Sequence, residues 1–138
     1  MNNYRRYVVE GNPVTKKNSQ RIVKNSRGIP FLMPSKQYKT FEREAIKQLE
    51  RVKEPVPITN PVNIRYTFNM MTHRQVDGLN LAAAMDDILV KAGILADDCR
   101  DIVAGHDGTR VYCESGEPRT VIEIWDMEDY GQWKTWET

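Results

Sequence analysis

The sequence predicts a small mixed α/β (α+β) fold, one domain in which a mixed β-sheet carries two main helices on one face. Three observations lead to this fold class. Residues 62–70 alternate apolar and polar side chains, which is the pattern of a half-buried strand. Residues 35–53 and 79–92 each place apolar side chains at helical spacing. A length of 138 residues suits a single domain.

The first part of the chain predicts two strands and a helix around a basic segment. Residues 4–11 are rich in β-forming side chains and end at a glycine, which favours a first strand. Residues 12–28 are polar, basic and turn-rich, so they favour a long loop or an irregular hairpin, and residues 29–34 favour a short strand. Ser35 is a good helix cap, and Pro55 stops the helix that follows.

The second helix has a start signal and a stop signal of its own. Asp77 stands at its N-cap position, and Gly93 stands where a helix usually ends. Beyond it, residues 101–113 favour a hairpin that turns at Asp107-Gly108, and residues 119–125 alternate as a last strand.

An acidic, aromatic tail is expected over residues 127–138, after a single domain over residues 1–126. Trp133 and Trp136 stand among acids in this tail, not far from Trp125. Bulky aromatic side chains anchor many protein interfaces. One interpretation is therefore a protein-interaction module whose tail contacts a replication or recombination protein.

The net charge of +1 hides a division between the two parts of the chain. Residues 1–53 carry 13 Lys and Arg against 4 Asp and Glu, whereas residues 54–138 carry 7 against 15. Either the two parts pair in the fold, or the basic part faces a polyanionic partner such as a nucleic acid.

Neither secretion nor membrane insertion is indicated. The start of the chain lacks the apolar core of a signal peptide, and the most apolar run, residues 88–95, is too short to span a bilayer. Cys99 and Cys113 form no CxxC motif and no disulfide framework. We therefore expect a cytoplasmic protein with reduced thiols and no membrane segment.

The two histidines give no sign of a zinc site. Neither His73 nor His106 has a Cys or a second His at zinc-ligand spacing. A structural or surface role is the expectation for both.

Three acids flank the second helix. Asp77 precedes it, and Asp97 and Asp98 follow it by a few residues. Each of them alone suits an ordinary cap or turn. If the helix folds over the sheet and strand pairing brings the chain back, two or three of these carboxylates converge at one end of the sheet. Oxygen ligands of this kind select Mg²⁺, or Mn²⁺ in its place, which activates water and stabilises charge on a phosphodiester.

Basic side chains supply the means of holding a nucleic acid. Lysine and arginine neutralise the phosphates of DNA, although such a segment can also be a plain solvated loop. The expected DNA-binding residues are Lys16, Lys17, Asn18, Arg21, Lys24, Arg27 and Arg74. Bases that hold a phosphate backbone beside acids that hold a metal form the layout of a metal-dependent nuclease.

A longer pattern runs through the second helix. It consists of Asp77, Asn80-Leu81, Asp87-x-Leu89, Lys91-Ala92-Gly93 and Asp97-Asp98, without a gap. In order and spacing it resembles the core pattern of the RusA family of Holliday-junction resolvases, DNA endonucleases common in phages and prophages. The basic "TKKNSQR" and the final "PRTVIEIW" are also similar to that family, so the resemblance covers most of residues 4–125.

The resemblance implies a RusA-like α/β fold that works as a homodimer. It implies Mg²⁺-dependent, symmetrical nicking of four-way DNA junctions in recombination and repair, with each subunit cutting one of two opposed strands. The family's first Asp falls on Asp77 and its last on Asp98, with Asp97 beside it, as metal ligands and catalytic residues.

Two positions depart from the family pattern. Leu79 stands where the family has a second Asp, and Ala83 where it has a Lys. Asp86 lies on the same side of the helix and is a candidate for a displaced carboxylate, about 10 Å along the axis from Leu79. Asn80 is a nearer supporting oxygen donor, and Lys16 or its neighbour could replace the missing amine. The chain is then either a divergent active nuclease, which the retained acids favour, or a branched-DNA-binding protein that cuts poorly or not at all.

Overall fold

The computed structural model describes residues 3–16, 20–73, 76–114 and 116–127, with only the backbone described at positions 20, 21, 32 and 34. The elements follow in the order β1 (Tyr4–Glu10), β2 (Gln20–Lys24), β3 (Pro30–Pro34), α1 (Lys36–Glu50), β4 (Val62–Asn69), α2 (Gly78–Lys91), β5 (Val103–Gly105), β6 (Arg110–Tyr112) and β7 (Arg119–Asp126). The predicted mixed α+β class is confirmed, with one mixed sheet, a separate β2–β3 pair and two helices.

The main sheet has β4 and β7 at its centre. β7 pairs antiparallel with β1 on one side and with β4 on the other. β5 and β6 pair with β4 in parallel on its remaining edge, β5 at the start of β4 and β6 at its end. Since β4, α2 and β5 follow one another and the two strands are parallel, α2 is the crossover that runs back along the sheet.

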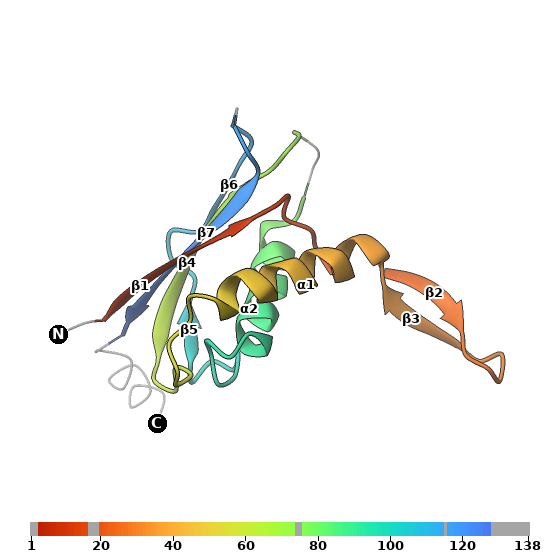
Figure 1. Cartoon of the computed structure of the whole chain (residues 1–138), viewed down its shortest axis with the longest axis horizontal. Coiled ribbons are helices and arrows are strands. Elements are labelled where there is room, and N and C mark those ends of the chain that lie inside the picture. Colours follow the sequence, from red (N-terminus) through yellow and green to blue (C-terminus); the bar gives the residue numbers. More distant parts are fainter. Residues whose placement is uncertain (1–2, 17–19, 74–75, 115, 128–138) are drawn as a thin grey trace, which may run out of the picture.

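One face of this sheet is buried under both helices (Figure 1). Along β4 every second side chain is buried, from Val62 to Phe68, as the alternation predicts. Ile122 and Ile124 of β7 complete the buried face, and Leu49 of α1 packs into the same core. The opposite face carries polar pairs such as Arg65 with Glu123, so the prediction of two helices on one face is confirmed.

Both predicted helix starts are confirmed by their caps. The Ser35 side chain accepts a hydrogen bond from the Tyr38 backbone N–H (3.1 Å), and Asp77 accepts one from the N–H of Leu79 (2.9 Å). At the end of α2, Gly93 adopts a φ of 82°, a left-handed conformation that glycine accepts without strain. The Asp77 cap and Gly93 therefore set the two ends of α2, the helix that carries the RusA-like pattern.

The predicted hairpin over residues 101–113 is wrong, although its turn is present. β5 and β6 do not pair with each other, because both run parallel to β4 along the same edge. The segment between them is a tight turn, in which the Thr109 N–H donates to the His106 carbonyl (3.2 Å) and Gly108 has a φ of 88°. The turn interrupts a parallel edge strand instead of reversing the chain.

Strands β2 and β3 form a hairpin that projects from the start of α1, away from the sheet and the other helix (Figure 1). We call residues 20–34 the arm. The Asn25 side chain closes its turn by accepting hydrogen bonds from the N–H groups of Arg27 (2.9 Å) and Ile29 (3.0 Å). Ile22 and Phe31 remain 73% and 44% exposed, so the arm presents apolar surface to solvent.

Candidate functional site

The structure separates the acids that flank α2. α2 has 14 residues, so its ends lie about 21 Å apart along the axis. Asp77 caps the end near β6, where Gly78 lies beside Val111. Asp97 and Asp98 lie at the other end, just before the segment whose Ile102 carbonyl accepts from the Val62 N–H at the start of β4 (2.8 Å).

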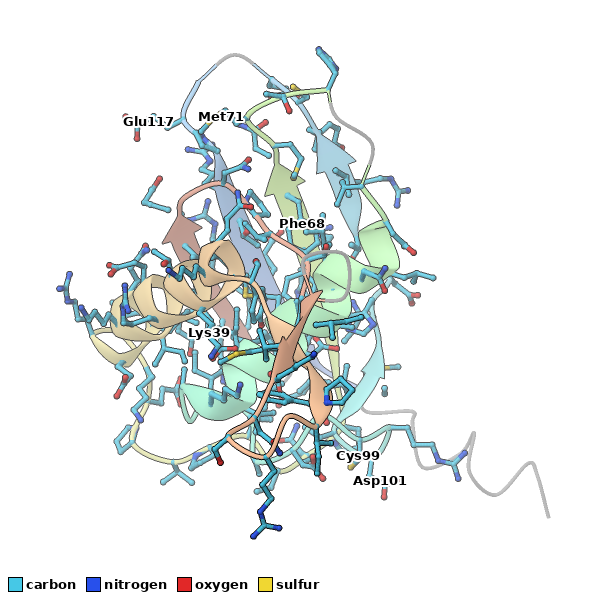
Figure 2. The ribbon with its side chains drawn as sticks, turned by 90° about the vertical axis from the view of Figure 1, so that its right-hand side faces the viewer. Lys39, Phe68, Met71, Cys99, Asp101 and Glu117 are labelled. Carbon is cyan, nitrogen blue, oxygen red and sulfur yellow. The ribbon has the colours of Figure 1, made fainter. Side chains whose placement is uncertain are left out.

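The same separation is visible in the side-chain view. Figure 2 shows Met71, which follows β4, at one end of the molecule, and Cys99, the neighbour of Asp98, at the other. The expected convergence of Asp77 with Asp97 and Asp98 is therefore not found. The return of the chain to β4 occurs at the start of that strand, whereas Asp77 stands beyond its end.

An acidic group does form at the end of α2 where Asp97 and Asp98 lie. The pKa of the Asp98 carboxyl is raised, first by desolvation and then by the charge of Asp97, while its own backbone N–H opposes the rise. Asp86 and Asp87, in the second half of α2, also raise the pKa of Asp98. We call Asp86, Asp87, Asp97 and Asp98 the acidic group, because their charges act on one carboxyl.

Two lysines stand at the edge of the acidic group. Lys91 Nζ lies 3.2 Å from Asp87 Oδ2 and 3.1 Å from Glu42 Oε2 of α1. Lys16 Nζ, from the basic N-terminal segment, lies 3.8 Å from the same Asp87 oxygen. The basic and acidic parts of the chain therefore meet at this point, and Lys16 brings an amine to the helix that carries Ala83 in place of the family's Lys.

Asp86 has partners that differ from the expected metal role. Its residue is only 6% exposed, and its Oδ1 accepts a hydrogen bond from the Tyr66 hydroxyl (2.5 Å). Its Oδ2 lies 2.8 Å from His106 Nε2, which must donate because a carboxylate only accepts. Both oxygens thus accept hydrogen bonds within the fold, which is a different role from that of the expected displaced carboxylate.

The pKa values of both partners of Asp86 are raised above their ordinary values. Burial, and then the charge and hydrogen bond of Asp86, raise the pKa of Tyr66 well above its ordinary value, so the phenol stays neutral and donates. The hydrogen bond to Asp86 raises the pKa of His106, with the charges of Asp86 and Asp107 adding to the rise and burial opposing it. The His106 and Tyr66 rings also stack, with centroids 5.8 Å apart.

The turn between β5 and β6 holds His106 in place. Asn63 of β4 brackets this turn, since its side chain accepts from the Asp107 N–H (2.8 Å) and donates to the Asp107 carbonyl (3.2 Å). Thr109 Oγ1 accepts from the Tyr66 N–H (3.1 Å), which satisfies β4 where the edge strand is interrupted. Sequence reasoning missed this role of His106 because its partner Asp86 lies 20 residues away in the chain.

The two positions that depart from the family pattern are open to solvent. Leu79 is 82% exposed and Ala83 is exposed, both on the first turns of α2, while Asn80 is half-buried near Asp77. Asn80 therefore accompanies the cap and stands apart from the acidic group at the far end of the helix. Within the described residues, no three His, Cys, Asp or Glu side chains lie close enough together to hold a metal ion.

The expected DNA-binding residues are described only in part. Lys24 and Arg27 lie exposed on the arm, and Lys16 lies at the acidic group. Lys17, Asn18, Arg74 and the side chain of Arg21 lie outside the described residues, as does the tail beyond Met127. The helices in the described ranges include none with the length and apolar character needed to cross a membrane.

Comparison with known proteins adds no family assignment to this geometry. The sequence matches no protein-family model and no curated protein. The fold and the arrangement of charges around α2 are accordingly the observations from which a function is argued.

Proposed function

We propose that the protein is a Mg²⁺-dependent, structure-selective DNA endonuclease that resolves four-way junctions by symmetrical nicking. The observation that carries the proposal is the contact between Lys16 and Asp87, where the basic N-terminal part of the chain meets the acidic group. A nuclease needs cations that hold the phosphate backbone and carboxylates that hold a metal beside it. The RusA-like pattern over residues 77–98 points in the same direction.

The oxygen donors at the end of α2 suit Mg²⁺ in the form in which proteins often bind it. Mg²⁺ commonly keeps several waters and takes one or two carboxylates together with phosphate oxygens of the substrate. Asp98 fits this requirement, because desolvation and then the neighbouring acids disfavour its charged form, and a bound cation offsets both effects. Asp97 and Asp98 would hold the ion, which when bound supplies an activated water and stabilises charge on the phosphate.

The arm supports the binding part of the proposal. Lys24 and Arg27 project from it with no acidic residue in the sequence between positions 20 and 34. An isolated two-stranded hairpin is only marginally stable in water, so a projecting arm with exposed apolar side chains suits a segment that gains order on contact with a partner. Phosphates of a branched DNA complement its charge.

Symmetrical nicking requires two equivalent sites. A homodimer with two-fold symmetry supplies them, one for each of two opposed strands of the junction. DNA recombination and repair in the cytoplasm, where cysteines such as Cys99 and Cys113 stay reduced, is the setting that we propose for this activity.

The test is a titration of Mg²⁺ and Mn²⁺ with an end-labelled four-way junction, and a linear duplex of the same sequence as control. We expect paired nicks at symmetry-related positions of the junction, and none in the duplex. Junction binding without cutting under either metal would replace the proposal by a branched-DNA-binding protein. Deletion of residues 127–138 that abolishes binding to a replication or recombination protein but leaves cutting intact would make the tail an accessory.

A further inference from the structure

His106 and Asp86 form a pair to which the proposed nuclease mechanism has so far assigned no role. Asp86 is a buried carboxylate in the middle of an apolar helix face, and burial of a charge is costly unless hydrogen-bonded partners compensate for it. Histidine is the side chain that exchanges a proton near neutral pH, so a partly exposed histidine held by a buried carboxylate is suited to proton transfer. Asp86 is itself a member of the acidic group, and Asp87, the next residue of α2, lies 3.8 Å from Lys16 and 3.2 Å from Lys91.

The ring of His106 is held from two sides. Asp86 on α2 engages Nε2, and Tyr66 on β4 stacks against the ring. In the described part of the chain every hydrogen bond of the ring runs through Nε2, so Nδ1 is the nitrogen left to exchange a proton. The side chain is 34% exposed, in contrast to 9% for that of Asp86, so the imidazole is the member of the pair that is open to solvent.

We infer that His106 is the general acid of the proposed phosphodiester hydrolysis and donates the Nδ1 proton to the leaving sugar oxygen. Asp86 and Tyr66 are its positioning residues. This inference rests on the proposed function. In the step, the oxygen of water forms a bond to phosphorus and gives up one proton to solvent. The bond from phosphorus to the sugar oxygen breaks, that oxygen takes the proton of the imidazolium, and His106 then regains a proton from solvent.

The surroundings of His106 favour the protonated ring that this step requires. The charged and titratable groups around it are Asp86 of α2, Tyr66 of β4 and Asp107 in its own turn, with the Arg65 side chain against Gly108 of the same turn. Two of these are acids, the phenol stays neutral, and the charge of Arg65 is paired with Glu123 (2.8 Å). The net field therefore stabilises the imidazolium, which is the state of a general acid.

A substrate whose leaving group needs no proton distinguishes a catalytic role of His106 from a structural one. The ends of the product first identify which sugar oxygen leaves, and a junction with sulfur at that bridging position is then compared with the normal junction. We expect His106→Gln to lower the single-turnover cutting rate of the normal junction by about 10²–10⁴-fold. The sulfur junction should be cut at nearly the wild-type rate, because a thiolate leaves without protonation. His73→Gln, at the other histidine, is the matched control and should cut both junctions as the wild type does.

The wild-type protein gives a second measurement that does not depend on the folding of a variant. Its cutting rate should fall at alkaline pH as His106 loses its proton, and this fall should be absent with the sulfur junction. A His106→Gln protein that cuts the normal junction at the wild-type rate overturns the inference, and so does a defect of equal size on both junctions. Absence of cutting by the wild type removes the proposed function and the inference with it, whereas the first two results leave the proposed function standing.

Discussion

His106 Nε2 lies 2.8 Å from Asp86 Oδ2, and this contact joins the turn between β5 and β6 to the middle of α2. It spans 20 residues of sequence and links an edge of the sheet to the helix that covers it. Because the pair is partly buried and ionic when the histidine is protonated, it bears on the stability of the fold as well as on its chemistry.

The pair makes the stability depend on pH in a defined direction. Since Asp86 raises the pKa of His106 above 6.5, the stabilisation is complete below that value and is lost as pH rises through the higher folded-state pKa. We expect His106→Gln to lower the free energy of unfolding by about 1–2 kcal/mol at pH 5.5 and by less at pH 9. Urea denaturation at the two pH values measures this, and an equal loss at both would show that the ionic pairing contributes nothing.

The charge of Asp98 should lower the free energy of unfolding at neutral pH, although the proposed metal site needs that charge. Its raised pKa means that its charged form is disfavoured in the fold, so the charge destabilises the protein at pH 7 and has no effect below the unfolded pKa of about 3.9. Asp98→Asn is expected to raise the free energy of unfolding at pH 7 by up to about 0.5 kcal/mol, a small effect because the residue is exposed. Thermal denaturation at pH 7 and pH 3 compares the two states, and a destabilised variant at pH 7 would contradict the proposed repulsion.

The capping role of Asp77 has its own test. Its side chain accepts from the Leu79 N–H, so Asp77→Ala should cost about 1 kcal/mol of unfolding free energy. Asp77→Asn should cost almost nothing, because asparagine caps helices about as well as aspartate does. Chemical denaturation of the two variants distinguishes the contribution of the capping hydrogen bond from that of the negative charge. Equal destabilisation by both variants would point to a role for the charge itself.

The cations of the arm should govern DNA affinity. Removal of Lys24 and Arg27 together, as Lys24→Ser with Arg27→Ser, is expected to weaken junction binding and to flatten its dependence on salt by about two units of slope. The control changes the same charge on the exposed face of α1, as Lys39→Ser with Lys47→Ser, and should leave that slope nearly unchanged. Binding isotherms between low and moderate salt decide between the two surfaces, and an unaltered slope in the arm variant would exclude its phosphate contacts.

Local sequence signals predicted most of the fold. The alternation over residues 62–70, the caps at Ser35 and Asp77 and the stop at Gly93 each depend on side chains that lie next to one another in the chain. The hairpin predicted over residues 101–113 failed because a turn signal reports only a local bend. The strand with which the residues on each side of the turn pair depends on contacts distant in sequence. Here β5 and β6 both pair with β4.

The candidate site was only partly predictable for the same reason. The acids around α2 were found from their spacing, but their convergence depended on which end of the sheet the chain returns to. A signal for His106 was present, because Asp86 interrupts the buried face between Met85 and Ile88, and a buried carboxylate needs a donor. The sequence alone could not show that the donor would come from the turn between β5 and β6, at the edge of the sheet beside β4.

The most direct test of the proposed nuclease compares Asp98→Asn with Asp77→Asn in single-turnover cutting of a four-way junction with Mg²⁺, alongside measured junction binding. The proposal predicts that Asp98→Asn abolishes cutting while binding is kept, and that Asp77→Asn cuts at nearly the wild-type rate, because Asp77 stands at the opposite end of α2 from the acidic group. Undiminished cutting by Asp98→Asn would contradict the assignment of the site to this end of the helix.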